Sequence, residues 1–346
     1  MFCCKENEAG LTKPRVSVVI SVYNGAEFLQ QSIQSILDQT FSDFELIVID
    51  DGSTDDSMTV AQAFRDPRIR TILNTENKGG AYRRRQAVDM AEGEYIAQQD
   101  ADDFSLPERL RLQVNYLDGH PEVGFLGTGA FSCHTGKIND RPYLFPLTDL
   151  EMRWRMVFGI PTAHSTLMVR KSVIEQHQVR YDPAFRFCFD YDFYERCLEF
   201  TRGANLPVGL VVHRIHSNQM TKTNRPEQFT YHLAISRRIL QKKLPEIQLS
   251  DDDLAEICHM LIGREKFYLA TAKIEKNAIQ NYLRAYRMFL QCYGGWPIVG
   301  LRDPVLADLA RMCRRRPRNS GWLVRWAVLE FLAVISGITR GWFYRR

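Results

Sequence analysis

The fold of this 346-residue chain is decided by residues 16–50, VSVVISVYNGAEFLQQSIQSILDQTFSDFELIVID. Val16–Ser21 is a run of apolar and β-branched residues, which predicts a buried strand. Glu27–Gln39 carries apolar residues at helical spacing, and Glu45–Asp50 is a second apolar run that leads into a turn. The stretch therefore predicts a strand, a helix and a second strand, the unit from which parallel sheets are built.

The same alternation continues toward the C-terminus. We expect further strands and helices at Ile69–Leu73, Glu94–Gln99, Asp56–Phe64, Gly80–Ala91 and Pro107–Leu117. This order predicts an α/β protein whose sheet is largely parallel at its start. Ligands of such sheets bind beyond the carboxyl ends of the strands, so the polar loops there are the expected place for chemistry. After Gly124 the pattern is less regular, and we expect loops up to about Asn205.

Composition and charge limit the class of protein. Hydrophobic residues make up 45% and charged residues 25%, which is ordinary for a globular chain and disfavours disorder over most of the length. The eight cysteines form no Cys-x-x-Cys pair and are too sparse for a disulfide scaffold, which favours a reducing compartment. The N-terminus has no apolar stretch long enough for a signal peptide, so we expect a cytoplasmic protein.

Four regions are expected along the chain: a leader at 1–14, a catalytic domain at 15–225, a helical region at 226–320 and a tail helix at 321–346. The tail is basic, because Arg311–Arg346 holds nine arginines and one acid. That local charge of +8 leaves −4 for the rest of the chain, since the net charge is +4. We expect the tail to bind an anionic membrane surface rather than nucleic acid.

The tail also predicts how it meets a membrane. In Gly321–Ile338 apolar residues recur on one helical face, and tryptophans and arginines flank them. The longest run without charge, Phe331–Thr339, has nine residues, whereas a span needs about 20. A helix lying in the headgroup region is therefore the favoured interpretation, and packing against the protein's own core is the alternative.

Acidic residues follow two of the predicted strands. Asp51 comes directly after the second strand and can accept hydrogen bonds from a base or ribose, or simply cap a turn. The loop Asp100–Asp103 holds three carboxylates in four residues, which suits a divalent cation or a solvated acidic loop. Between them lies Arg83-Arg84-Arg85, able to face a diphosphate, although we expect at least two of the three to be solvated.

These pieces, in this order, resemble family 2 glycosyltransferases of the GT-A fold. The resemblance is carried by VSVVISVYNGAEFLQQSIQSILDQTFSDFELIVIDDGSTDDS and NKGGAYRRRQAVDMAEGEYIAQQDADDFSLPERL, and it continues through AHSTLMVRKSVI, FRFCFDYDFYERC and VVHRIHSNQMT. It covers about residues 15–222. It implies a Rossmann-like GT-A nucleotide-diphospho-sugar transferase fold with a helical C-terminal extension.

The resemblance assigns roles to individual residues. It implies that the nucleotide sugar, with a UDP-sugar as the leading donor, is bound by Tyr23, Asn24, Asp51, Arg84 and Asp100. It implies that a divalent metal ion, Mn²⁺ or Mg²⁺, is held by Asp102, with His216 near the diphosphate or metal. His164 matches a position that is frequently polar, with a satisfied, semi-buried histidine as the alternative.

The catalytic base is implied to be Asp190. Most relatives carry Glu-Asp at this point, so Phe189 is a departure that leaves the register between Asp190 and Asp192 open. Capping of the helix expected at Tyr191–Phe200 is a second role that Asp190 can have. This assignment implies transfer to an acceptor hydroxyl with inversion. The resemblance and the basic tail together imply a hexosyl- or N-acetylhexosaminyltransferase of polysaccharide assembly, which acts on a saccharide or lipid-linked saccharide at the inner membrane face.

The residues disfavour three other functions. A non-catalytic protein that keeps the fold and acts through a protein partner is disfavoured, because it has no need of Asp51, Asp102 and Asp190 together. A nucleotidyltransferase requires a glycine-rich phosphate loop, but Tyr23-Asn24-Gly25-Ala26 holds one glycine. A dinucleotide oxidoreductase is disfavoured for the same reason, since no Gly-x-Gly-x-x-Gly follows the first strand.

Overall fold

A computed structural model describes residues 13–262, 280–286 and 288. Its first half alternates strands and helices as predicted: β1 (Val16–Val22), α1 (Ala26–Leu37), β2 (Phe44–Asp50), α2 (Ser57–Ala63), β3 (Ile69–Ile72), α3 (Gly80–Met90), β4 (Tyr95–Asp100), β5 (Phe104–Ser105) and α4 (Arg109–Gly119). The predicted boundaries differ from these by one or two residues.

The second half holds longer strands and more helices. These are β6 (Val123–His134), β7 (Lys137–Ile138), α5 (Asp149–Phe158), the 3₁₀ turn η1 (His164–Thr166), β8 (Met168–Arg170), α6 (Lys171–Gln176), α7 (Phe189–Cys197), β9 (Arg202–Ile215), α8 (Met220–Thr223), α9 (Arg225–Lys243) and α10 (Asp251–Ile262). The predicted tail helix at Gly321–Ile338 lies outside the described residues.

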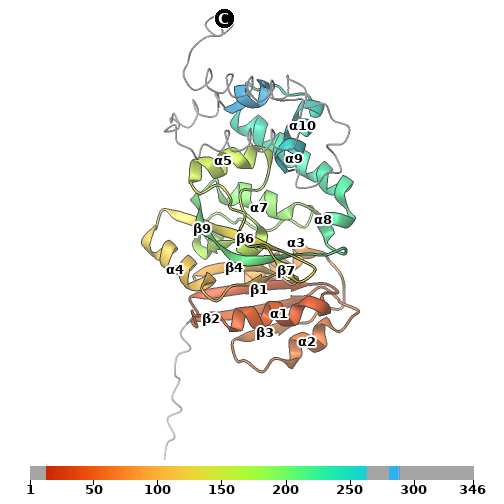
Figure 1. Cartoon of the computed structure of the whole chain (residues 1–346). Coiled ribbons are helices and arrows are strands. Elements are labelled where there is room, and N and C mark those ends of the chain that lie inside the picture. Colours follow the sequence, from red (N-terminus) through yellow and green to blue (C-terminus); the bar gives the residue numbers. More distant parts are fainter. Residues whose placement is uncertain (1–12, 263–279, 287, 289–346) are drawn as a thin grey trace, which may run out of the picture.

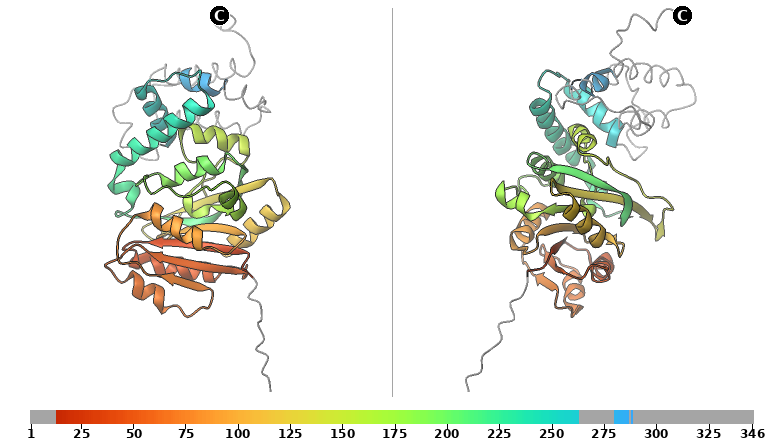
Figure 2. Two further views of the ribbon diagram at one scale, coloured as in Figure 1. Left: turned by 180° about the vertical axis from the view of Figure 1, so that it is seen from behind. Right: turned by 90° about the vertical axis from the view of Figure 1, so that its left-hand side faces the viewer.

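The strands form one sheet in the order β3-β2-β1-β4-β8-β6-β9-β5, with β7 paired to β6. The strands β3, β2, β1 and β4 are mutually parallel, and β8 runs antiparallel to both β4 and β6. Helices cover both faces of the sheet (Figures 1 and 2). The sheet is therefore parallel where the sequence predicted it and mixed beyond β4.

The two faces of the sheet are buried by different helices. Alternate residues of β1, such as Val18 and Ile20, pack with α1, α2 and α4. Val19 points to the other face, which shares one core with α3, α5, α7, α9 and α10. Tyr282 joins the same core, because the indole of Trp154 on α5 donates to its hydroxyl at 3.1 Å. The helices α9 and α10 thus share a core with the sheet domain.

The expectation of loops between Gly124 and Asn205 is wrong for β6. Its glycines allow close packing rather than turns: a Cβ on Gly127 would lie 2.0 Å from the side chains of both Thr162 and Asn205. β6 pairs with β9 almost throughout, in parallel and with irregular register near Gly129. Glycine in a central strand marks close approach of neighbours, which a single sequence does not distinguish from a loop.

Candidate active site

The ends of three parallel strands bring the predicted loops together. Val22 pairs with Asp50 and Ser21 with Asp100, so β1, β2 and β4 end at the same edge of the sheet. The loops that begin at Tyr23, Asp51 and Ala101 therefore leave the sheet side by side. This is the edge at which ligands of open α/β sheets bind.

Asp51 organises the loop before α3. Its buried carboxylate accepts hydrogen bonds from the backbone N–H groups of Lys78 and Gly79, both at 2.8 Å, and from Nε of Arg83 at 2.7 Å. Gly79 has φ +89°, a conformation that other residues rarely adopt. Gly52 next to Asp51 has φ +75°, and a Cβ there would lie 2.9 Å from backbone. Asp51 thus holds the α3 loop against the end of β2.

Tyr23 and Asn24 line the same edge. Asn24, with φ +50°, accepts from the backbone N–H of Thr54 at 2.8 Å, and its own N–H donates to Ser53 Oγ at 2.9 Å. These two hydrogen bonds tie the loop after β1 to the loop after β2. The ring of Tyr23 is 51% exposed, which leaves it available to a ligand.

The expectation that at least two of the three arginines are solvated is wrong. Arg83 and Arg84 are buried, and only Arg85 is exposed. Arg83 pairs with Asp51, and Arg84 donates from Nη2 to Asp100 Oδ1 at 2.6 Å. The physical reason is that α3 faces the acidic edge, where a buried carboxylate requires a cation.

Asp100 is surrounded by donors. Besides Arg84, it contacts Nδ1 of His164 at 3.0 Å and accepts from Ser165 Oγ at 2.8 Å. Burial alone raises the pKa of this carboxyl, but His164, Arg84 and the Ser165 hydroxyl outweigh burial and hold the pKa well below its ordinary value. Asp100 is therefore an ionised carboxylate throughout the physiological pH range.

The two neighbouring acids, Asp102 and Asp103, have environments that differ from that of Asp100. Asp103 is buried, and burial together with the charges of Asp102 and Asp100 raises its pKa well above the ordinary value. It accepts from Ser165 Oγ and from the backbone N–H of Arg214 at 3.1 Å. Of the three acids, Asp103 is thus the buried one, whereas Asp102 and Asp100 are partly exposed, with 32% and 28% of their side chains accessible.

Asp102 and His216 come together, although they are far apart in the sequence. His216 Nε2 lies 3.0 Å from Asp102 Oδ2. Arg214 at the end of β9 donates to the carbonyl of Asp102 at 2.6 Å, and the ring of Phe28 on α1 packs at 4.8 Å from His216. The imidazole is therefore held beside the carboxylate by two elements.

The donors at this point fit a divalent ion. A carboxylate and an imidazole are both suitable for Mn²⁺, and Mg²⁺ is commonly bound by one or two carboxylates with phosphate oxygens completing the shell. Over the part of the chain that the structure describes, no cluster of three or more His, Cys, Asp or Glu side chains is placed for a metal.

Asp190 lies in the first turn of α7. The helix begins after Cys188, which adopts the left-handed conformation with φ +54°, and Asp190 Oδ1 accepts from the backbone N–H of Tyr191 at 2.9 Å. Burial raises the pKa of Asp190 above its ordinary value, while the nearby His164 and Arg84 lower it. Since His164 and Arg84 also contact Asp100, Asp190 and the β4 loop share one electrostatic environment.

Asp192 has a different environment. It is buried and pairs with Arg196 Nε at 3.0 Å on its own helix and with Arg238 Nη2 at 2.8 Å on α9. Its ion pairs tie α7 to α9. The two neighbouring acids of α7 thus have different partners.

His164 is the satisfied, semi-buried histidine named as the alternative. It bridges Asp100 through Nδ1 and the hydroxyl of Tyr181 through Nε2, at 3.0 and 3.1 Å. Four residues of this environment were not predicted as site residues: Asp103, Ser165, Tyr181 and Arg214. Asp103, Ser165 and Arg214 lie within the motifs that carry the family resemblance, whereas Tyr181 has no distinguishing pattern in a single sequence.

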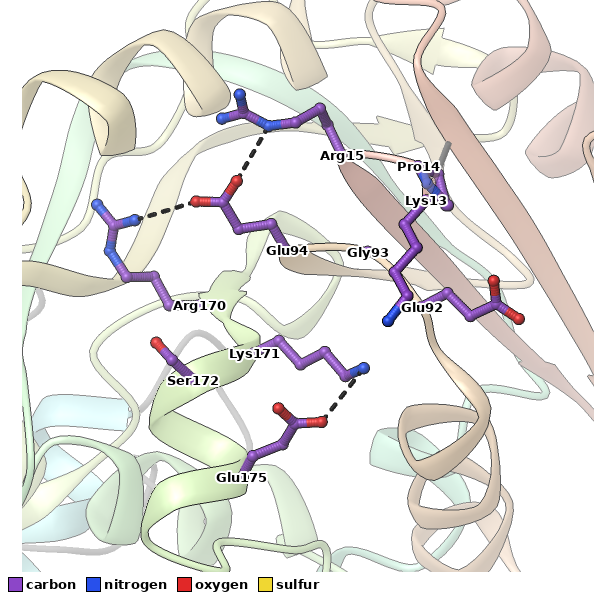
Figure 3. Close-up of a pocket in the computed structure, with 10 residues that line it drawn as sticks. All are labelled: Lys13, Pro14, Arg15, Glu92, Gly93, Glu94, Arg170, Lys171, Ser172 and Glu175. Carbon is purple, nitrogen blue, oxygen red and sulfur yellow. Dashed lines mark ion pairs between the residues drawn. The ribbon is translucent and has the colours of Figure 1, made fainter. Parts of the chain in front are cut away.

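A separate groove of about 490 Å³ lies at the opposite edge of the sheet (Figure 3). It is lined by residues that precede β1 and β4 and by the start of α6: Lys13, Pro14, Arg15, Glu92, Gly93, Glu94, Arg170, Lys171, Ser172 and Glu175. None of the predicted site residues lines it. The chemistry-bearing loops are therefore at the carboxyl edge, and the groove is at the amino edge.

Comparison with known proteins agrees with this geometry. Residues 17–177 match the family model described as Glycosyl transferase family 2. An uncharacterized glycosyltransferase of Haemophilus influenzae is 29% identical over 303 residues, 81% of this chain and 93% of that protein. EpsE of Bacillus subtilis is 36% identical over 162 residues, 46% of this chain, and the chain spans only 57% of its length.

Solved structures show the same fold. The crystal structure of TarS 1–349 from S. aureus has a TM-score of 0.56 and 18% identity, covering 96% of this chain and 93% of that one. Sheet order, acidic loops and this likeness define an α/β protein with the GT-A fold. More particularly, residues 17–177, just under half of the chain, match glycosyl transferase family 2, and the relatives to which the chain is similar are named as glycosyltransferases. The predicted family and fold class are thereby confirmed.

Proposed function

We propose that this glycosyltransferase transfers a hexose or N-acetylhexosamine from a UDP-sugar to an acceptor hydroxyl with inversion, and that Asp190 is the base. The observation that carries this proposal is that Asp190 shares His164 and Arg84 with Asp100, at the edge where the loops of Asp51 and Asp102 also lie. The groups that we assign to donor binding and the partly exposed carboxylate of Asp190 thus lie at the carboxyl edge of the sheet.

The assignment of Asp190 rather than Asp192 follows from their partners. Asp192 is buried in ion pairs with Arg196 on its own helix and Arg238 on α9. Asp190 has a pKa raised by burial, which strengthens it as a base. It accepts the acceptor hydroxyl proton as the new C–O bond forms on the face opposite the leaving diphosphate, and a single displacement inverts the anomeric centre.

The donor assignment is supported by relatives and by the carboxyl edge. One TarS structure is titled as a complex with UDP-GlcNAc, and WfaP of Escherichia coli is named a UDP-Glc:alpha-D-GlcNAc-diphosphoundecaprenol beta-1,3-glucosyltransferase. We assign the base and ribose to Tyr23, Asn24 and Asp51; Asp51 is buried and supports this place through the loop of Lys78 and Gly79 that it holds. Arg84, with Asp100, faces the diphosphate, where a guanidinium stabilises negative charge on the leaving group.

A divalent ion would be held by Asp102, with His216 beside it. PcManGT of Pyrobaculum calidifontis is titled as a complex with GDP-Man and Mn²⁺. When bound, such an ion supplies Lewis-acid stabilisation of the departing diphosphate. His216 keeps the Asp102 carboxylate oriented through the 3.0 Å contact, and Arg214 fixes the backbone of the same loop.

We also propose that the protein works in cell-surface polysaccharide assembly, in the cytoplasm, at the inner face of the membrane. A saccharide or lipid-linked saccharide is the acceptor, and the basic tail of 321–346 provides the membrane contact. In the described part of the chain, no helix is long and apolar enough to cross a bilayer. The support is therefore the tail composition and the lipid-diphosphate acceptor in the name of WfaP.

The test is a donor screen with the full chain. UDP-, GDP- and TDP-sugars are compared for binding and for hydrolysis in the presence of Mn²⁺, Mg²⁺ or a chelator. We expect a UDP-sugar to bind and to be hydrolysed slowly without acceptor, with turnover lost on chelation. Selective use of a GDP- or TDP-sugar would overturn the UDP assignment, and undiminished turnover in chelator would overturn the metal role. Pelleting of the full chain with anionic vesicles, compared with a variant lacking residues 312–346, tests the membrane contact.

A further inference from the structure

Arg84 is enclosed on several sides at the carboxyl edge. Its Nη2 donates to Asp100 at 2.6 Å, and the centre of its guanidinium lies 5.1 Å from the ring centroid of Phe189. The side chain is buried, and within the described residues its Nε has no hydrogen-bond partner. An arginine with one carboxylate contact and a buried free donor depends on its other neighbours for its orientation.

Phe189 is itself held by aromatic rings. Its ring lies edge-on to His164 and Tyr181, with centroids 6.1 Å apart in both cases and interplanar angles of 87° and 73°. Tyr181 in turn stacks on Phe193, at 4.1 Å and 13°. Because Phe189 is the first residue of α7, the ring is fixed both by its helix and by these neighbours.

The backbone of Gly80 lies beside both the guanidinium and the Phe189 ring. A Cβ placed on Gly80 would lie 2.9 Å from Nη1 of Arg84 and 3.5 Å from two atoms of the Phe189 ring. A methyl group there would push the end of a long side chain, not the backbone. The guanidinium therefore fills a slot between the start of α3 and the start of α7.

We propose that Phe189 is a positioning residue that clamps the Arg84 guanidinium against Asp100, and so fixes the donor-side cation relative to Asp190 next along α7. The proposal rests on the proposed function, since it assigns Arg84 to the diphosphate. The ring face attracts the cation and keeps water away from it, which an aliphatic side chain cannot do equally well. One aromatic residue thus joins the donor side of the site to the base side.

The first experiment removes the ring from the full chain. Phe189→Leu is expected to weaken UDP-sugar binding by about 2- to 30-fold, the range of one cation–π contact, and Phe189→Tyr should restore most of the affinity. In an Arg84→Gln background, the Leu change should alter affinity less than about twofold, since its target is gone. Phe185→Leu is the matched control: Phe185 also lies near an arginine, Arg238 at 5.8 Å, away from Asp100, and donor affinity should not change.

A second pair of variants tests the space around the Arg84 guanidinium from the α3 backbone. Gly80→Ala should weaken donor binding to a similar extent while the protein folds normally, because alanine is the better helix former. Gly119→Ala in α4 is its control, since a Cβ there meets nothing within 4 Å. Unchanged donor affinity in Gly80→Ala would contradict the proposed slot.

The outcomes separate the clamp from the proposed function. If the parent chain binds UDP-sugars but Phe189→Leu weakens binding equally with and without Arg84, the clamp is wrong and the function stands. If the parent binds no nucleotide sugar, the proposed function is wrong. The clamp is then judged by urea unfolding of the parent, Phe189→Leu, Arg84→Gln and the double variant. Additive shifts of the unfolding midpoint would overturn the clamp, and non-additive shifts would support it.

Discussion

The two edges of the sheet carry the same kinds of charged residue in opposite circumstances. At the amino edge, Arg15 and Glu94 pair at 3.1 Å with 39% and 52% of their side chains exposed (Figure 3). At the carboxyl edge, Arg83 and Asp51 pair at 2.7 Å with 3% exposed each. Exposed pairs contribute about 0–1 kcal/mol, whereas breaking a buried pair destabilises by about 3–5 kcal/mol.

The difference shows at which edge of the sheet the pKa values of neighbouring carboxyl groups are shifted in opposite directions. Water screens the charges of the amino edge, so its ion pairs contribute little to stability. At the carboxyl edge, His164, Arg84 and the Ser165 hydroxyl outweigh burial and lower the pKa of Asp100. Burial and the charges of Asp102 and Asp100 raise the pKa of Asp103. Acids with opposite shifts in one cluster are typical of sites that bind ions or transfer protons.

The largest effect is expected for Asp190→Asn. The amide keeps the size of the side chain but cannot take a proton, so sugar transfer should fall by about 10²–10⁴-fold, the usual contribution of a general base. UDP-sugar affinity should change less than about twofold, because the donor loops are not altered. Initial rates and calorimetric titration check the two quantities. Transfer at the parental rate would exclude Asp190 as the base.

Asp192→Asn is the matched variant, because it makes the same substitution at the other acid in the first turn of α7. It leaves Arg196 and Arg238 without their shared carboxylate, and we expect a loss of about 3–5 kcal/mol from the free energy of unfolding. The pairs are partly open at their arginine ends, so the lower end of that range is expected. Protein that remains folded should keep its rate per active site. A stable but inactive variant would reverse the assignment of the two acids.

The dependence of transfer on pH is the next test. The base acts when deprotonated, and burial raises the pKa of Asp190, so the rate should fall tenfold per pH unit below that pKa. His164 lowers this pKa, and His164→Gln should therefore move the fall in rate to higher pH. Tyr181→Phe removes the other hydrogen bond of His164 but keeps the imidazole, and should leave the profile in place. An unshifted profile in His164→Gln would show that His164 does not act on the base.

The sequence predicted the part of the fold that depends on local pattern. The strand predicted at Val16–Ser21 is Val16–Val22, and the parallel order placed Asp51 and Asp102 at one edge. The sequence did not predict the long pair of β6 and β9. There the decisive contacts are between distant residues, such as Gly127 against Asn205, and glycine in isolation indicates a loop.

The site was predictable by residue type but not by environment. Carboxylates after strands were visible in the sequence, whereas the burial of Arg83 and Arg84 depends on how α3 meets those carboxylates. Asp192 is distinguished from Asp190 by Arg238, which lies 46 residues further along the chain. Ion pairs across such distances follow from tertiary packing, and no spacing rule encodes them.

The smallest effect is expected at the amino edge, with Glu94→Gln. Glu94 lies near Arg15 and Arg170, and all three are at the rim of the groove in Figure 3. Removal of an exposed charge should change the free energy of unfolding by less than about 1 kcal/mol, and the change should shrink further at high salt. Donor affinity and transfer rate should stay at parental values, since the carboxyl edge is untouched. A tenfold loss of donor affinity would show that the two edges are coupled, and the contrast between them would then fail.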